Sequence, residues 1–469
     1  MYLLPSNEGS VMQRIDVHKL ADEAKFNRFH LSVLIWCFGI LVIDGYDLVV
    51  VGAALPSIIK EMGVNAATAG FMASSALFGA MFGAIILGTL ADKIGRRWAI
   101  SLCVLFFSVF TAAAGLTSDP ITFSVMRFLA GLGIGGAIPN VVAQMTEYAP
   151  KKVRGVMVTL MACGYAIGSI IAALLGKQFI ETAGWQSVFL IAGAPAMLIP
   201  FIQKYMPESL PFLIKQNDDT HLRQVVGKLR PDIRLEPHEE FLVPAEDKAE
   251  GPTVGRLFTE GRGLSTVMFW IANLLGLFMV YALSTWLVQL MAQAGYSLGS
   301  ALNFLLAYNI GAIAGAVGGG WLADRFNIKW VTFGYLVVAA VALTLLGFGT
   351  QPLVLVVAVV GASTLGTQIL VFTYTGQFYP TSIRGTGLGF ASGIGRIGAI
   401  AAPIVIGFLV LLKLPLVLNF VAIGSAGAIA AVAVAVINHR LSASMHTFDA
   451  TQSEDADMGG LGRGAEAQA

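Results

Sequence analysis

GTLADKIGRR, residues 88–97, joins two long apolar runs, and its first half returns later in the chain as GWLADR, residues 320–325. A second motif also occurs twice, as YAPKKVRG at 148–155 and as FYPTSIRG at 378–385, and its two copies are separated by nearly the same number of residues. The offset is about 230 residues, the period that one duplicated unit of six spans would give. Two repeated segments at nearly the same separation therefore predict two pseudo-symmetric halves. The alternative is chance repetition of a loop motif, which two repeats at one separation disfavour.

The composition is that of a chain whose solvent is mostly lipid. Hydrophobic residues make up 56% of the 469 residues, charged residues 12%, and the mean hydropathy is +0.75. A soluble globular protein carries roughly 25% charged residues. The formal net charge is +1, and no basic arm or basic stripe with interleaved aromatic residues appears, so we predict no nucleic-acid partner.

A membrane-spanning helix needs about 20 predominantly apolar residues. We expect about twelve such helices, at 31–53, 67–89, 98–116, 121–143, 154–176, 184–205, 264–290, 298–321, 329–348, 353–378, 385–411 and 415–437. The predicted fold is thus an all-α membrane protein. Its predicted parts are an N-terminal tail (1–30), a six-helix half (31–205), a polar central loop (206–263), a second six-helix half (264–437) and a disordered tail (438–469).

The positions of Lys and Arg in the short loops predict the orientation, because cytoplasmic loops carry the positive excess. One side has Arg14, Lys19, Lys25, Arg28, Lys93, Arg96, Arg97, Lys151, Lys152, Arg154, Arg325, Lys329 and Arg384, and the other has Lys60, Lys177 and Lys413. Both termini and the central loop are therefore predicted to face the cytoplasm.

Segment 88–97 closely resembles the signature loop of the major facilitator superfamily, and RFLAGLG from Arg127 and PES at 207–209 support the resemblance. DGYD at 44–47 resembles the signature motif of the aromatic acid:proton symporter family. IDVHKL at 15–20 and FNRFH at 26–30 are similar to benzoate transporters within that family. One departure is FNIK at 326–329, which replaces the Gly-Arg-Arg ending in the second half.

The resemblance implies a carrier with the superfamily fold in a bacterial inner membrane. It would import a small aromatic carboxylate together with protons by alternating access of two halves to a midplane site. The proton gradient would drive it, without a cofactor or metal, and we expect it to act as a monomer in the lipid bilayer. The preferred acid and the number of protons stay open.

Two acids lie inside the first span. Asp44 is about 13 residues into it, roughly 20 Å along a helix, and Asp47 follows on the same face. An ionised Asp at this depth costs roughly 2.5 to 3.5 kcal/mol, so such acids persist only if paired, protonated or facing water. We group Asp44, Asp47, Arg127 and Glu147 as proton-coupling candidates. The alternative is that one Asp caps a break at Gly45 or pairs permanently with an arginine.

Two arginines also lie inside apolar spans, Arg127 in the fourth and Arg396 in the eleventh. A guanidinium matches a substrate carboxylate and a protein carboxylate equally well. Our hypothesis assigns Arg396, on a helix rich in glycine, to the substrate and Arg127, from the resemblance, to the acids of span 1. Either arginine could instead neutralise a buried acid.

An aromatic ring needs an apolar pocket with a few polar anchors. The candidates for this pocket are Tyr46, Asn273, Tyr281, Trp286, Asn309, Gln368, Phe372 and Tyr374. Each could instead pack or hydrogen-bond between helices.

A further set of loop residues is predicted to latch neighbouring helix ends in one conformation. The set is Gly88, Asp92, Gly95, Arg96, Arg97, Arg154, Asp324, Arg325 and Arg384. The alternative is a positive loop that only sets orientation. The GxGxxG matches at 131–136 and 393–398 follow no strand, so we interpret them as sites of close helix packing.

Other classes of function fit less well. An enzyme would need a nucleophile with a base or a metal cluster, and the spans show neither pattern. A receptor for aromatic acids would not need two acids inside a span. A carrier for another organic acid, or a drug exporter, stays an alternative because a fold does not determine the substrate.

Overall fold

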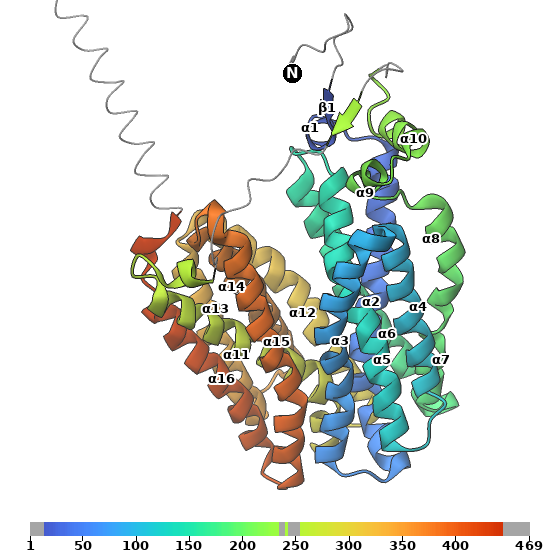
Figure 1. Ribbon diagram of the computed structural model, residues 1–469. Coiled ribbons are helices and arrows are strands. Elements are labelled where there is room, and N and C mark those ends of the chain that lie inside the picture. Colours follow the sequence, from blue (N-terminus) through green and yellow to red (C-terminus); the bar gives the residue numbers. More distant parts are fainter. Residues whose placement is uncertain (1–13, 234–239, 243–253, 444–469) are drawn as a thin grey trace, which may run out of the picture. The chain divides into compact units, whose positions relative to one another are not determined.

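The computed structural model describes residues 14–233, 240–242 and 254–443 of the chain (Figure 1). Within these residues, 12 helices are long and apolar enough to cross a membrane, which confirms the predicted fold class. They are α2 (Arg28–Met62), α3 (Ala66–Ile94), α4 (Arg96–Ala114), α5 (Pro120–Tyr148), α6 (Arg154–Ala183), α7 to α8 (Gln186–Tyr205), α11 (Gly263–Gln293), α12 (Leu298–Arg325), α13 (Ile328–Gly347), α14 (Leu353–Phe378), α15 (Thr381–Leu411) and α16 (Leu416–Val436).

The sixth span is not one regular helix. It consists of α7 (Gln186–Ile191), the 3-10 helix η1 (Ala194–Leu198) and α8 (Ile199–Tyr205). Pro195 and Pro200 stand at the starts of η1 and α8. Proline donates no backbone hydrogen bond and clashes with the preceding turn, and two prolines five residues apart therefore favour breaks in this helix.

Contacts divide the chain into two units, and each is described by itself. Unit 1 comprises Met1–Asp247, Leu283–Ile310 and Pro403–Leu414, and unit 2 comprises Lys248–Ala282, Gly311–Ala402 and Pro415–Ala469. Two segments from the second half of the sequence, 283–310 and 403–414, therefore group with unit 1. The domain boundaries expected from the sequence stay predictions.

Glycines set the spacing between helices in both units. In unit 1 a Cβ added to Gly79, Gly83 or Gly135 would overlap the backbone of the facing helix of the α3–α5 pair. In unit 2 a Cβ at Gly311 or Gly315 would overlap the backbone of α14. Small residues permit such close approach of helix backbones, so these glycines serve helix packing, as expected for segment 131–136.

The sequence did not predict a small folded region beside the membrane helices of unit 1, here called the cap. It comprises β1 (Arg14–Asp16), α1 (Val17–Asp22), α9 (Leu210–Lys215), α10 (Asp219–Leu229) and β2 (Glu240–Leu242). The strands pair in parallel, with Ile15 opposite Phe241. Val17 and Leu20 of α1 are buried in one cluster with Leu222 and Val226 of α10. The cap thus joins the N-terminal segment to the central loop.

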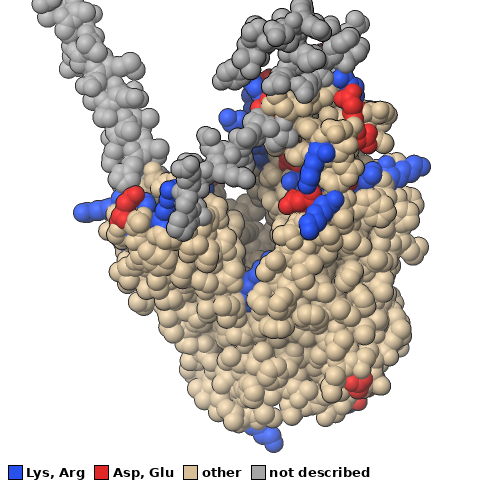
Figure 2. All heavy atoms as spheres, in the orientation of Figure 1, with Lys and Arg blue, Asp and Glu red and all other residues tan. Residues whose placement is uncertain are grey.

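Two short 3-10 helices belong to unit 2, η2 (Gly255–Phe258) and η3 (His439–Leu441). The disordered tail predicted for 438–469 lies mostly outside the described residues, as does the start of the N-terminal tail. On the face of unit 1 seen in Figure 2, charged side chains gather at the end where α9 and α10 lie. The long middle of its helices shows almost only other residue types, as a lipid-facing surface requires (Figure 2).

Candidate functional site

A buried ion pair connects the first and fourth membrane helices. Arg127 of α5 and Asp47 of α2 are each 1% exposed. Arg127 Nη1 donates to Asp47 Oδ1 at 3.0 Å and to Oδ2 at 3.1 Å, and Arg127 Nη2 donates to the Asp47 carbonyl oxygen at 3.1 Å. The guanidinium therefore holds both the side chain and the backbone of Asp47.

A third helix completes this site. Arg127 Nη1 also donates to Thr111 Oγ1 of α4 at 2.6 Å. Charges inside a membrane are tolerated when they are paired and hydrogen-bonded, and α2, α4 and α5 together supply these partners. The pairing agrees with the hypothesis that Arg127 belongs with the acids of span 1.

Asp44 lies one turn before Asp47 on α2 and is fully buried. At the same level, Gly45 packs against the backbone of Tyr165 and Gly168 against that of Val42, which brings α6 against α2. The two acids therefore lie in a closely packed part of unit 1.

Glu147 lies elsewhere. It is twenty residues after Arg127 on α5, about 30 Å along the helix. Its carboxylate forms an ion pair with Arg96 and accepts hydrogen bonds from the Leu210 N–H and, at 3.1 Å, from Ser209 Oγ. The structure brings Glu147 to the predicted latch residue Arg96 and not to Asp47, and its proton-coupling role stays a prediction.

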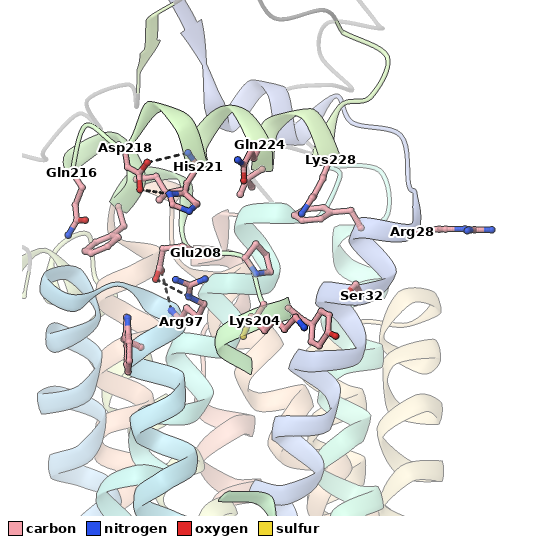
Figure 3. A pocket seen from close by; sticks show the side chains of 18 of the residues that line it. Arg28, Ser32, Arg97, Lys204, Glu208, Gln216, Asp218, His221, Gln224 and Lys228 are labelled. Carbon is pink, nitrogen blue, oxygen red and sulfur yellow. Dashed lines mark hydrogen bonds and ion pairs between the residues drawn. The ribbon is translucent and has the colours of Figure 1, made fainter. Parts of the chain in front are cut away.

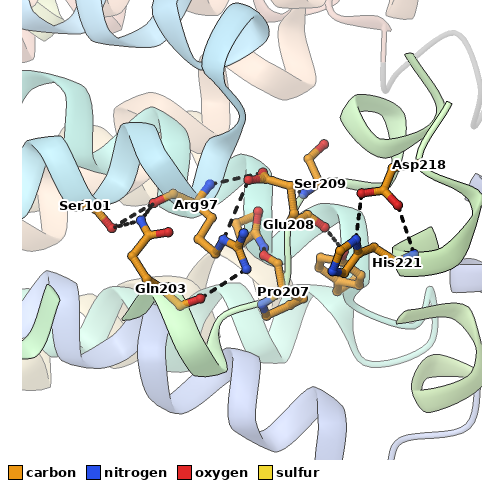
Figure 4. A network of polar contacts seen from close by, with 10 residues as sticks. Arg97, Ser101, Gln203, Pro207, Glu208, Ser209, Asp218 and His221 are labelled. Atoms are coloured by element: carbon orange, nitrogen blue, oxygen red, sulfur yellow. Dashed lines mark hydrogen bonds and ion pairs between the residues drawn. The ribbon is translucent and has the colours of Figure 1, made fainter. Parts of the chain in front are cut away.

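The loop between α3 and α4 is held to the segment after α8 (Figure 4). Glu208 Oε1 accepts a hydrogen bond from the Arg97 N–H at 3.1 Å, and Arg97 Nη1 donates to the Gln203 carbonyl oxygen at 3.1 Å. Arg97 Nε is 3.9 Å from Glu208 Oε2. Gly95 has a φ of 91°, and a Cβ there would be 2.6 Å from Glu208 Oε2, so both the turn and the contact require glycine.

The repeated arginines occupy equivalent positions in the two units. Arg154 Nε donates to the Ala149 carbonyl oxygen at 3.1 Å, and Arg384 Nε donates to the Tyr379 carbonyl oxygen at 3.4 Å. Each arginine thus binds the carbonyl at the C-terminal end of the preceding helix, α5 or α14, where a cation is favoured. Arg154 also forms an ion pair with Asp22 of the cap.

The other predicted latch residues contribute less to this network. Asp92 is exposed, and its carbonyl oxygen accepts a hydrogen bond from Lys215 Nζ at 3.2 Å. Gly88 has open space around it. In unit 2 Asp324 is exposed, and Arg325 lies over the Trp321 ring at 4.1 Å.

Three predicted substrate residues lie on neighbouring helices of unit 2. Gln368 Nε2 of α14 donates to Asn273 Oδ1 of α11 at 3.4 Å. On α15, Gly398 packs against Leu274, and a Cβ at Gly395 would be 3.4 Å from the Asn273 carbonyl oxygen. Arg396 lies between these two glycines and is partly exposed.

Other predicted pocket residues make structural contacts. The Tyr46 hydroxyl donates to the Val188 carbonyl oxygen at 2.7 Å, and Trp286 Nε1 donates to that of Pro403 at 3.0 Å. Asn309 Nδ2 donates within its own helix at 2.9 Å. On α14, the Tyr374 hydroxyl is 3.1 Å from His439 Nδ1, and the Phe372 side chain is 47% exposed. These placements favour packing for this group, and Tyr281, partly buried on α11, stays a candidate.

Sequence reasoning gave no role to four residues that complete the site, Asp22, Thr111, Glu208 and Ser209. Glu208 and Ser209 carried a signal, since they belong to the PES segment that resembles the superfamily. Thr111 is one of many hydroxyl residues in apolar runs, and Asp22 is one of several acids in a polar segment. Only their contacts distinguish them.

Comparison with known proteins identifies the class. A family model described as the Major Facilitator Superfamily matches residues 37–403 and 269–453, and the chain belongs to this superfamily of membrane transporters, which are not enzymes. The chain is 42% identical to a benzoate transport protein of Acinetobacter baylyi, over 91% of this chain and 94% of that one. It is 36% identical to a gentisate transporter of Corynebacterium glutamicum, over 87% of both chains.

Solved structures agree on the fold. The xylose transporter XylE from E. coli, in a partially occluded inward-open conformation, matches with a TM-score of 0.67 and 16% identity, over 87% of this chain and 97% of that one. At this identity the likeness concerns the fold alone. The chain is thus a multi-pass membrane protein of the superfamily that segment 88–97 indicated.

Proposed function

We propose that this chain is a proton-coupled symporter that imports a small aromatic carboxylate, of the benzoate or hydroxybenzoate type, into a bacterial cell. The names of the two relatives support the substrate class, since benzoate and gentisate are both ring carboxylates. In this proposal the chain acts as a monomer in the inner membrane, with both termini in the cytoplasm. The proton gradient drives it, and no cofactor takes part.

The buried Asp47–Arg127 pair is the observation that carries the proposed coupling. A proton that reaches Asp47 removes its charge and weakens the pair, and Arg127 must then find other partners. Such a change alters the contacts between α2, α4 and α5. Asp44, one turn away on α2, is the second proposed proton carrier.

For the substrate, we place the carboxylate on Arg396 of α15, through a charge-assisted bidentate contact. The Asn273 and Gln368 amides, which lie together on α11 and α14, then face the ring and its hydroxyl groups. Amides both donate and accept hydrogen bonds, so they suit hydroxybenzoates as well as benzoate. Binding, proton uptake and alternating access together give symport.

The test is uptake of labelled benzoate into proteoliposomes that contain the purified chain. Accumulation is expected with an acidic exterior, to about tenfold per pH unit for one proton per anion, and not without the gradient. Unlabelled 4-hydroxybenzoate and gentisate should compete, whereas benzamide, which lacks the carboxylate, should not. Binding without accumulation would indicate a receptor, and competition by aliphatic acids alone would indicate a carrier for another organic acid.

A further inference from the structure

A cavity of about 960 Å³ lies in unit 1, apart from the ion pair at Asp47 (Figure 3). Its walls come from the starts of α2 and α4 and from the end of α8, and α9 and α10 of the cap cover it. The Arg97–Glu208 contact of the latch is part of its lining. Cavities that bind small molecules have similar volumes, about 300 to 1,000 Å³.

The charged lining favours an anion. Four basic residues, Arg28, Arg97, Lys204 and Lys228, and two acidic residues, Glu208 and Asp218, line the cavity, and Arg28 points away from it (Figure 3). The other three positive charges minus the two negative charges leave a net charge of +1 with His221 neutral. The two acids are already engaged, because Glu208 contacts Arg97 and Asp218 contacts His221 at 2.7 Å.

Two of the cations face the cavity from different elements. Lys228 of α10 points from the cap towards the cavity, and Lys204 of α8 lies on the membrane side in the same view (Figure 3). Among the described residues, neither lysine forms an ion pair with a carboxylate.

The cavity lies at the level where membrane helices end. Trp98, near the start of α4, is 52% exposed, and Tyr205, the last residue of α8, is 54% exposed. Exposed Trp and Tyr residues mark the headgroup region of a bilayer. Lys204 Nζ lies 5.3 Å from the centre of the Tyr205 ring.

The same lining has an apolar part. Phe212 and Leu213 of α9 and Val225 of α10 line the cavity together with the lysines. A ligand that fits both parts carries a negative charge and an apolar body. A soluble phosphate matches the lysines only, whereas a phospholipid matches the lysines, the apolar wall and the position beside the bilayer.

We propose that this cavity binds the headgroup of an anionic phospholipid, with its phosphate between Lys204 and Lys228. The lipid then connects α8 to α10 of the cap, next to the Arg97–Glu208 contact. The bound lipid stabilises the packing of the cap on the membrane helices. Basic pockets between membrane helices at the cytoplasmic side are known to suit anionic lipid headgroups.

The test is native mass spectrometry of the full chain in detergent, titrated with phosphatidylglycerol or phosphatidylcholine. The variant is Lys204→Gln/Lys228→Gln, and the control is Lys151→Gln/Lys152→Gln, which removes the same charge from the α5–α6 loop outside the cavity. We expect phosphatidylglycerol to bind the wild type and control equally and the variant about 10- to 30-fold more weakly. Phosphatidylcholine should bind all three weakly.

Two results overturn the proposal. One is equal loss of phosphatidylglycerol in the variant and the control, which indicates an effect of net charge alone. The other is displacement of the lipid by soluble glycerol phosphate at equal concentration, which identifies a soluble phosphate as the occupant. Circular dichroism of both variants confirms that they are folded before either result is interpreted.

Discussion

Arg127 on α5 contacts Asp47 on α2 through three hydrogen bonds, two to the carboxylate and one to the backbone carbonyl oxygen. The pair is 1% exposed at both residues and lies within the membrane-spanning part of unit 1. Neither side chain is exposed to solvent, so substitution of one residue leaves the charge of the other buried without a counter-charge.

Removal of one partner should therefore cost more than removal of both. We expect Arg127→Gln to destabilise the chain by about 3 to 5 kcal/mol, because it leaves a buried carboxylate without its counter-charge. Asp47→Asn/Arg127→Gln should recover a large part of this loss. Thermal unfolding in detergent measures both, and additive losses in the double variant would contradict the pairing as a stabilising contact.

The pair also bears on the number of protons. Because Arg127 keeps a positive charge beside Asp47, we expect Asp44 and Asp47 to take up one proton between them for each anion, so that no net charge moves. Uptake into proteoliposomes at a fixed pH difference should then be unchanged when valinomycin and potassium collapse the potential. Two protons would move one net positive charge, and each 100 mV would contribute about 2.3 kcal/mol, so a fall in uptake would rule out the one-proton scheme.

Glu147 distinguishes a latch from a proton carrier. Its contacts with Arg96, Ser209 and the Leu210 N–H join the end of α5 to neighbouring segments. We expect Glu147→Gln to lower stability and the transport rate while accumulation still follows the pH gradient. Asp44→Asn is the comparison, since it should abolish accumulation. Loss of gradient dependence in Glu147→Gln would instead support the proton-coupling role predicted for Glu147 from the sequence.

Gly52 tests the close packing inside unit 1. A Cβ at Gly52 of α2 would overlap the Ser284 carbonyl group of α11, whereas a Cβ at Gly39 of the same helix would have nothing within 4 Å. We expect Gly52→Ala to destabilise the chain by about 1 to 3 kcal/mol through overpacking. Gly39→Ala should be neutral or slightly stabilising. Equal melting temperatures for the two variants would show that α2 and α11 are not in contact here.

Arg396 tests the substrate assignment. Arg396→Lys keeps the positive charge but removes the planar guanidinium group, which can form two parallel hydrogen bonds with a carboxylate. We expect the KM for benzoate to rise about tenfold or more, the effect of roughly 1.4 kcal/mol. Arg440→Lys, on an exposed arginine of η3, is the control. An unchanged KM in Arg396→Lys would remove Arg396 from the proposed site.

Much of the fold was predictable because the membrane constrains each span locally. Every backbone polar group must be satisfied inside the span, so hydropathy alone predicts twelve helices. The breaks in the sixth span were less visible, although Pro195 and Pro200 carried the signal. The cap was not predictable, because its strands are three residues each and pair segments more than two hundred residues apart.

Hydropathy and charge along the chain already show which charged residues need an explanation. Asp44, Asp47, Arg127 and Arg396 stand in apolar runs, and the cost of burying a charge identifies them without any structure. The partners of these residues follow from the folded chain alone, in which Arg127 pairs with Asp47 and Glu147 pairs with Arg96. The physical reason is that burial depends on local composition, whereas a hydrogen bond depends on where helices distant in sequence bring two side chains within about 3 Å.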